Sequence, residues 1–180
     1  MPSPLGHALG GIATGWLVCG VAGDASPRPQ PLWRNPAVRS QVLLFATLGM
    51  LPDIDLLFGI HSTYTHSVGA ALIVGLAALA LAGTRGARLA LACALAYASH
   101  ALLDWLGTDR RAPIGIMALW PFTDRFYQAE LHWFMAVRRE YWMTDFWSQN
   151  IAAVTREIAI LGTAVALVGW LRRPRRRTHA

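Results

Sequence analysis

Five long apolar stretches, separated by short polar loops, restrict the folds that this chain can adopt. Hydrophobic residues make up 54% of its 180 residues and charged residues only 14%, whereas charged residues form about 25% of a typical soluble domain. Stretches of this length and composition are typical of membrane-spanning helices. We therefore expect an all-α, multi-pass transmembrane helical bundle, a single domain over residues 1–180 with about four to five spanning helices. The stretches cover residues 6–22, 42–60, 67–82, 89–106 and 151–171.

The segment between the last two stretches, residues 107–150, has a different character. Prolines interrupt it, and aromatic residues are interleaved with charged ones. Such a mixture is typical of segments at the membrane–water boundary. We expect residues 123–149 to form an amphipathic helix at that boundary. An ordinary aromatic-rich helical cap is the alternative.

Arginine residues predict how the bundle is oriented. If the stretches cross the membrane in alternation, the loops 23–39 and 83–88 and the tail 172–180 lie on one side, and all three are rich in Arg. The positive-inside rule assigns this side to the cytoplasm. The N-terminus, the loop 61–66 and the segment 107–150 are then expected on the outer side.

The net charge of +6 at pH 7 belongs mainly to these loops and the tail. We therefore expect membrane lipids, and not nucleic acid, as partners. The residues before His7 include no basic side chain, so the first stretch is expected to be retained and not removed as a signal peptide. Cys19 and Cys93 lie inside apolar stretches and are interpreted as small buried hydrophobes.

His100 and Asp104 are an unusual pair inside an apolar stretch. Residues four apart share one face of a helix. Burying an imidazole and a carboxylate there is unfavourable unless something neutralises them. A metal ion is one solution, and a hydrogen-bonded structural pair is the alternative.

Further His and Asp residues fall at the same end of the predicted bundle. Pro52 is expected to kink or end the second stretch, which places Asp53 and Asp55 on a turn or a short helix. His7 at the start of the first stretch and His66 before the third lie at that end as well. Four stretches thus bring ionisable side chains to one level, and such residues in a membrane protein are functional candidates.

Imidazoles and carboxylates without a thiol suit Zn²⁺, with Mn²⁺ or Fe²⁺ as alternatives. Bound metal lowers the pKa of water toward about 7 and polarises a phosphoryl oxygen, and two ions about 3.5–4 Å apart serve phosphate-ester cleavage. We therefore expect a metal-dependent hydrolase, acting on a phosphoester at headgroup depth that is either a small molecule or lipid-linked. A non-enzymatic protein with a metal-binding or structural cluster is the alternative, and a soluble helical enzyme is a third.

Each candidate residue also has a simpler interpretation. Asp53 and His66 are expected to bind metal, but they could instead cap a turn and a loop. His7 is either a ligand or a solvent-facing residue at a helix start. Asp55 is either a ligand or supports a ligating His, and Asp104 and Asp55 are the predicted catalytic residues. Weaker candidates, interpreted mainly as solvated or interfacial, are His61, Asp109, His132, Glu130 and Asp124.

Five short segments together resemble the YdjM-like family. They are residues 2–7 (PSPLGH), 51–55 (LPDID), 65–67 (THS), 100–104 (HALLD) and 118–122 (ALWPF). That family is described as LexA-regulated, membrane-bound, metal-dependent hydrolases of the bacterial inner membrane. It is grouped with zinc-dependent phospholipases C and single-strand nucleases, which are all-helical enzymes with a multi-zinc cluster.

The resemblance implies a location in the bacterial inner membrane and a specific ligand set. His132 is followed four residues later by Ala136, so the later His-x-x-x-Glu pair of the grouped enzymes is absent. One or two ions are therefore expected instead of three. The implied ligands are His7, Asp53, His66, His100 and Asp104, with Asp104 as the bridge.

Overall fold

The structure, a computed structural model, describes residues 1–23, 31–59 and 61–173. Within these ranges the regular elements are helices, and β-structure is limited to two isolated bridges. This confirms the predicted all-α class. The longer elements are α1 (Pro4–Cys19), α2 (Pro36–Met50), α3 (Val68–Ala82), α4 (Ala87–Trp105), α5 (Phe146–Glu157) and α6 (Thr163–Leu171). The short elements are η1 (Leu32–Arg34), η2 (Leu51–Phe58), η3 (Tyr64–His66), η4 (Thr84–Gly86) and the π-helical η5 (Ile158–Gly162).

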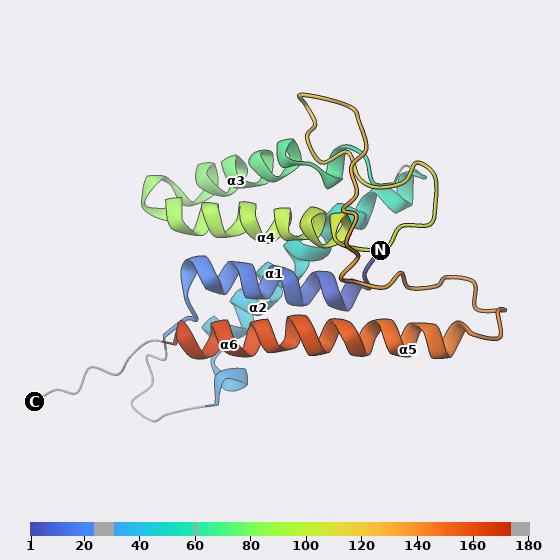
Figure 1. Cartoon of the computed structure of the whole chain (residues 1–180). Helices are drawn as coiled ribbons and strands as arrows, with labels where there is room; N and C mark the ends of the chain where they lie inside the picture. The colour runs from blue at the N-terminus through green and yellow to red at the C-terminus, as the bar shows by residue number, and fades with distance from the viewer. Residues whose placement is uncertain (24–30, 60, 174–180) are drawn as a thin grey trace, which may run out of the picture.

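Three continuous helices, formed where short elements extend α2, α4 and α5, are long and apolar enough to cross a membrane. They span Pro36–Phe58, Thr84–Trp105 and Phe146–Leu171, and α3 is a shorter apolar helix. The first predicted stretch forms α1, which has 16 residues and packs among α2, α4 and α6 (Figure 1).

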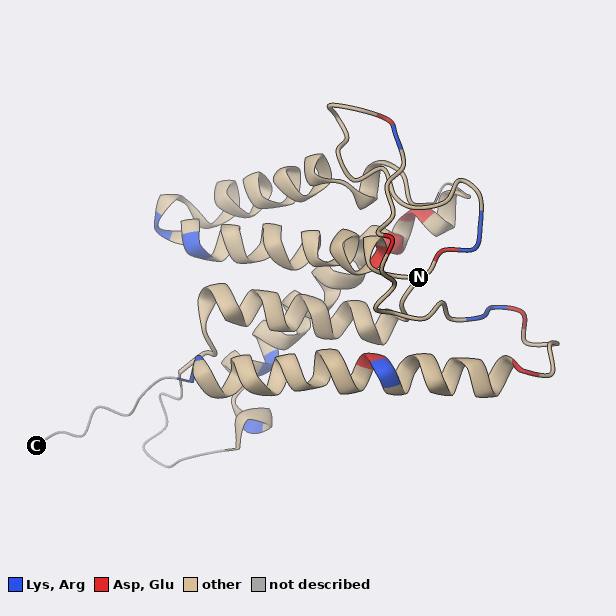
Figure 2. Cartoon of the chain, in the orientation of Figure 1, with Lys and Arg blue, Asp and Glu red and all other residues tan. Residues whose placement is uncertain are grey.

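The outward faces of these helices are apolar. Leu81 is 90% exposed and Leu76 is 64% exposed, and many other large apolar side chains face outward too. A soluble monomer rarely exposes so much contiguous apolar surface, whereas lipid chains accept it. Figure 2 shows most charged residues near the ends of the bundle. Arg156 and Glu157 lie within the last long helix, at the end of α5. These features support a helical membrane protein over a soluble enzyme.

The helices α1 and α2 cross with their backbones in contact. A Cβ atom on Gly11 would lie 2.2 Å from the Phe45 carbonyl oxygen, and one on Gly49 would lie 2.3 Å from the His7 carbonyl oxygen. The fully buried Phe45 ring fills the space over Gly15. Gly11 and Gly15, four residues apart in the first stretch, therefore permit the close approach of the two helices. This crossing also holds His7 beside the end of α2.

We expect Gly49→Ala to separate α1 from α2 and to lower the free energy of unfolding by about 1–3 kcal/mol, as overpacking does in other cores. Thermal unfolding of the purified protein in detergent micelles measures the change. Gly162→Ala is the matched control, because its new methyl group would lie 3.6 Å from Ile158 Cγ2, an ordinary van der Waals contact. Equal stability of the two variants would contradict the crossing.

The amphipathic helix predicted for residues 123–149 is wrong for most of that range, because the helix begins only at Phe146. The preceding residues run as an irregular chain across one end of the bundle (Figure 1). Ala129 N–H donates to the Trp105 carbonyl and Trp133 N–H donates to the Leu106 carbonyl. Carbonyls at a helix C-terminus have no partner inside the helix. Hydrogen bonds to the end of α4 therefore outweigh the amphipathic pattern.

The Arg-rich loops expected on one side of the membrane lie together at one end of the bundle, in the parts that the structure describes. Arg88 Nε donates to the Val18 carbonyl at 2.8 Å, and the Arg172 guanidinium donates to the same oxygen at 3.1 Å. The N-terminus and the segment between α4 and α5 lie at the opposite end (Figure 1). Most of the basic tail, residues 174–180, falls outside the described residues.

Candidate metal centre

The five predicted metal ligands come together at the end of the bundle that holds the N-terminus. They come from four elements: His7 from α1, Asp53 from η2, His66 from η3, and His100 and Asp104 from α4. Four of them are at most 1% exposed, whereas the Asp53 side chain is 26% exposed. The predicted convergence is therefore confirmed, and Asp53 is the member that is open to solvent.

The geometry of the short helix η2 directs the side chains of Asp53 and Asp55 toward different neighbours. Pro52 lies at the start of η2, directly after α2, as the sequence predicts. A 3₁₀-helix has about three residues per turn, so residues two apart point in different directions. Asp53 Oδ1 lies 3.6 Å from His100 Nε2, whereas Asp55 turns toward His61 and its carboxylate is buried.

The carboxylate of Asp104 lies at the centre of the cluster. Its Oδ1 is 3.4 Å from His7 Nε2, and its Oδ2 is 3.2 Å from His100 Nε2 and 3.3 Å from His66 Nε2. Neither oxygen has a hydrogen-bond partner among the described residues. A buried carboxylate without a donor is costly. A cation among these imidazoles would remove that cost, so the residues present fit a metal ion.

Hydrogen bonds behind the imidazoles orient them toward Asp104. His100 Nδ1–H donates to the Gly49 carbonyl at 2.7 Å, which leaves the Nε2 lone pair facing the cluster. His66 Nδ1 lies 3.2 Å from Asp55 Oδ2, and Thr65 Oγ1 donates to that oxygen at 2.9 Å. Partners of this kind typically fix ring orientation in metal sites. The geometry therefore favours Asp55 as a support for His66, and its catalytic role stays a prediction.

The donor atoms form three overlapping groups, and within each group they lie within 4.8 Å of one another. His61, a weaker sequence candidate, joins one group through the loop before η3. His66 and His100 contribute to two groups each, as does Asp53. These buried groups could hold a metal ion. The groups are His7, Asp53 and His100; His66, His100 and Asp104; and Asp53, Asp55, His61 and His66.

The electrostatics of the cluster favour positive charge at His66. Burial lowers the pKa of His66, but the carboxylates of Asp104, Asp53 and Asp55 beside its ring outweigh burial and raise this pKa well above its usual value. Nearby carboxylates stabilise whichever cation lies between them. A metal ion bound at the His66 ring would supply the positive charge in place of the proton.

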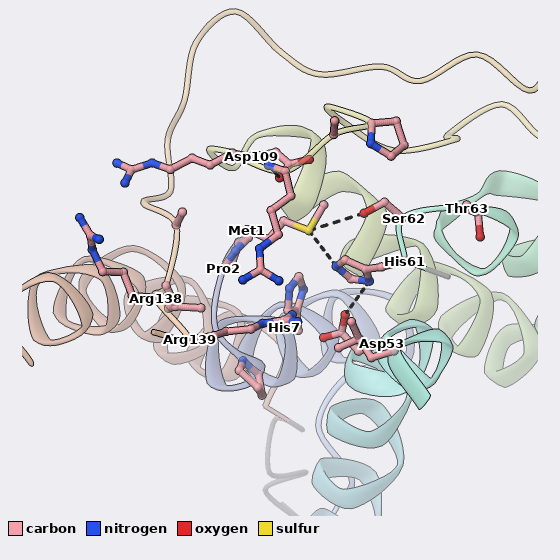
Figure 3. Close-up of a pocket in the computed structure, with 18 of the residues that line it drawn as sticks. Met1, Pro2, His7, Asp53, His61, Ser62, Thr63, Asp109, Arg138 and Arg139 are labelled. Carbon is pink, nitrogen blue, oxygen red and sulfur yellow. Dashed lines mark hydrogen bonds and ion pairs between the residues drawn. The ribbon is translucent and has the colours of Figure 1, made fainter. Parts of the chain in front are cut away.

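The cluster opens into a cavity of about 970 Å³. His7, Asp53 and His61 form part of its wall, and the Met1 side chain reaches over them (Figure 3). Met1 Sδ lies 3.1 Å from His61 Nε2. A cavity of this size accommodates a ligand of several hundred daltons, and Asp53 and His7 connect the buried cluster to it.

The other sequence candidates lie apart from the cluster. Asp109 lines the cavity, but its carboxylate accepts hydrogen bonds from the Arg111 and Gly115 N–H groups and so stabilises the local turn. The remaining three are exposed and belong to none of the donor groups: Asp124, Glu130 and His132.

Glu157 is a buried residue whose importance the sequence does not reveal. Arg156 is exposed, whereas the adjacent Glu157 is fully buried. Ser3 N–H donates to Glu157 Oε1 at 2.8 Å, and Ser3 Oγ donates to Oε2. Ser3 also caps α1, so Glu157 anchors the helix start that carries His7. The sequence could indicate this role only if the face of α5 that packs on α1 were already known.

Apolar helices and a buried His/Asp cluster at one end define a helical membrane protein with a candidate metal centre. The model of the family described as YdjM inner membrane protein matches residues 1–175. The chain therefore belongs to this family, and the match extends well beyond the short segments that resemble it. No curated protein and no solved structure matches the chain.

Proposed function

We propose that this protein is a metal-dependent hydrolase that cleaves a phosphoester at the membrane surface. The observation that carries the proposal is the environment of the Asp104 carboxylate. Its two buried oxygens lack hydrogen-bond partners among the described residues and face the Nε2 atoms of three imidazoles. As a purely structural arrangement this group of side chains is unfavourable, because the buried charge of Asp104 has no hydrogen-bond donor. It suits a divalent metal at a catalytic centre.

His7, Asp53, His66, His100 and Asp104 would hold one or two ions, with Zn²⁺ favoured and Mn²⁺ or Fe²⁺ as alternatives. Such ions activate a bound water and polarise a phosphoryl oxygen. Gly49 and Asp55 keep the His100 and His66 rings in place through their Nδ1 atoms. Asp53 and His7 line the cavity, so a substrate enters from their side.

The position of the cavity supports a substrate at the membrane boundary, either a lipid-linked phosphoester or a small molecule. The cavity lies at one end of helices whose outward faces are apolar. The Arg-rich loops lie at the other end, and the positive-inside rule assigns that end to the cytoplasm. The site would then face the outer side of the inner membrane, with a cytoplasmic C-terminus.

The test combines metal analysis with a phosphoesterase assay on the full-length protein in detergent micelles. Protein treated with a chelator should lose hydrolysis of bis-p-nitrophenyl phosphate and regain it with Zn²⁺ or Mn²⁺. His100→Ala should abolish both bound metal and turnover. His132→Ala is the control, because His132 is exposed and outside the cluster. Bound metal without turnover of any phosphoester would refute the hydrolase and support the alternative, a non-enzymatic metal-binding protein.

A further inference from the structure

The cavity beside the cluster is lined by residues of the candidate metal centre and by residues of the irregular chain between α4 and α5. The metal centre contributes His7, Asp53 and His61. The irregular chain between α4 and α5 contributes four arginines to the lining, together with Asp109, Glu140 and apolar side chains. The basic residues that line the cavity are Arg110, Arg111, Arg138 and Arg139.

Two of these four arginines are neutralised by acidic partners. Arg111 pairs with Glu140 at 2.7 Å and Arg138 pairs with Asp145 at 2.8 Å. Among the residues that the structure describes, Arg110 and Arg139 form no ion pair, and both are exposed. Arg110 and Arg139 are therefore the two arginines of the lining that are available to bind an anion, and Asp109 lines the same cavity.

Uncompensated guanidinium groups in a cavity attract anions. The planar guanidinium group donates paired hydrogen bonds that match a phosphate or carboxylate. A metal ion in the cluster would bind one anionic oxygen, and the arginines are then available for a second anionic group. A phosphodiester whose substituents are neutral has no second anionic group for the arginines to bind.

We propose that Arg110 and Arg139 form a binding subsite for a second anionic group, and that the ligand is an ester of diphosphate. One phosphate lies at the metal centre and the other contacts the arginines. The inference rests on the proposed function only for the position of the first phosphate. A lipid-linked diphosphate and a soluble nucleoside diphosphate share this chemistry.

The test measures binding of methylenediphosphonate, a diphosphate analogue that resists hydrolysis, and of orthophosphate by calorimetry. It uses the full-length, zinc-loaded protein in neutral detergent micelles, with protein-bound zinc measured afterwards. We expect the wild-type protein to bind the diphosphonate at least about 10-fold more tightly than orthophosphate, because one charged hydrogen bond raises affinity by about 10-fold or more. The double variant Arg110→Gln/Arg139→Gln should lose this preference and keep its zinc.

Arg125→Gln is the matched control. Arg125 lies in the same irregular segment and is exposed, but it does not line the cavity. If Arg125→Gln loses as much of the preference for diphosphonate as the double variant does, the arginines attract anions only in a general way and the proposal is overturned. A double variant that binds diphosphonate like the wild type would also overturn it. Competition with farnesyl diphosphate and with uridine diphosphate separates the two sources, and displacement by either one supports the diphosphate class.

The two proposals fail separately. Arginine-dependent diphosphonate binding in a protein that hydrolyses no phosphoester would refute the hydrolase and leave the subsite intact. Metal-dependent hydrolysis that is unchanged, in both KM and kcat, by Arg110→Gln/Arg139→Gln would refute the subsite and leave the hydrolase intact.

Discussion

Asp104→Asn is expected to lower the affinity for Zn²⁺ by at least about 100-fold, because even partners behind metal ligands contribute about 10–100-fold. The substitution keeps the shape of the side chain, so the packing of α4 should persist. It removes the charge that lies within 3.4 Å of three imidazole nitrogens. Competition with a chromophoric chelator measures the affinity, and elemental analysis measures the bound metal.

Asp109→Asn is the control for this experiment. Asp109 lines the same cavity, but its carboxylate accepts backbone N–H groups and lies outside the donor groups. Its substitution should leave metal binding unchanged. If Asp104→Asn and the wild-type protein bind the same amount of zinc with the same affinity, Asp104 is a structural residue and the metal centre is refuted.

The convergence of the ligands could be predicted from the sequence, because alternating apolar helices leave little freedom in where their ends lie. His66 precedes one helix and His100 lies near the end of the next, so an antiparallel pair must bring them to the same level. Their Nε2 atoms are 3.0 Å apart in the structure. The end of α2 just before Pro52, where the chain continues as the 3₁₀-helix η2, could also be predicted, since proline lacks the N–H group that continues an α-helix.

The features that could not be predicted depend on tertiary partners. The role of Asp55 depends on which nitrogen of His66 faces the cluster, and no spacing in the sequence contains this information. The conformation before Phe146 depends on the free carbonyls at the end of α4, which accept the Ala129 and Trp133 N–H groups. Local amphipathic patterns cannot show such long-range hydrogen bonds.

Gly49 connects the fold to the candidate site. Its lack of a side chain permits the backbone of α1 to approach, and its carbonyl accepts the Nδ1 proton of His100. The same position therefore sets the distance between α1 and α2 and the orientation of one imidazole. Packing and metal binding are coupled through this residue, so variants at the helix crossing should affect both.

Glu157→Ala is expected to lower the free energy of unfolding by about 3 kcal/mol and to weaken metal binding as well. The substitution leaves the buried Ser3 N–H without an acceptor, which alone costs about 1–3 kcal/mol, and it removes a second, charged hydrogen bond. The carboxylate also lies at the N-terminus of α1, where negative charge is favourable. Ser3 begins the helix that carries His7, so its release should displace that ligand and reduce zinc affinity by about 10-fold.

A second variant tests whether the Ser3–Glu157 hydrogen bonds, and not a general loss of stability, account for weaker metal binding. Glu157→Gln keeps an acceptor for Ser3 N–H and a group that can pair with Ser3 Oγ, so we expect most of the zinc affinity to return while part of the stability stays lost. Arg156→Gln is the control, because Arg156 is adjacent but exposed. Thermal unfolding in micelles and chelator competition are measured for all three variants. Glu157 accepts both hydrogen bonds from Ser3, so its removal should change stability, metal affinity or both if it holds the start of α1. If Glu157→Ala instead matches Arg156→Gln in both measurements, the buried carboxylate does not anchor α1.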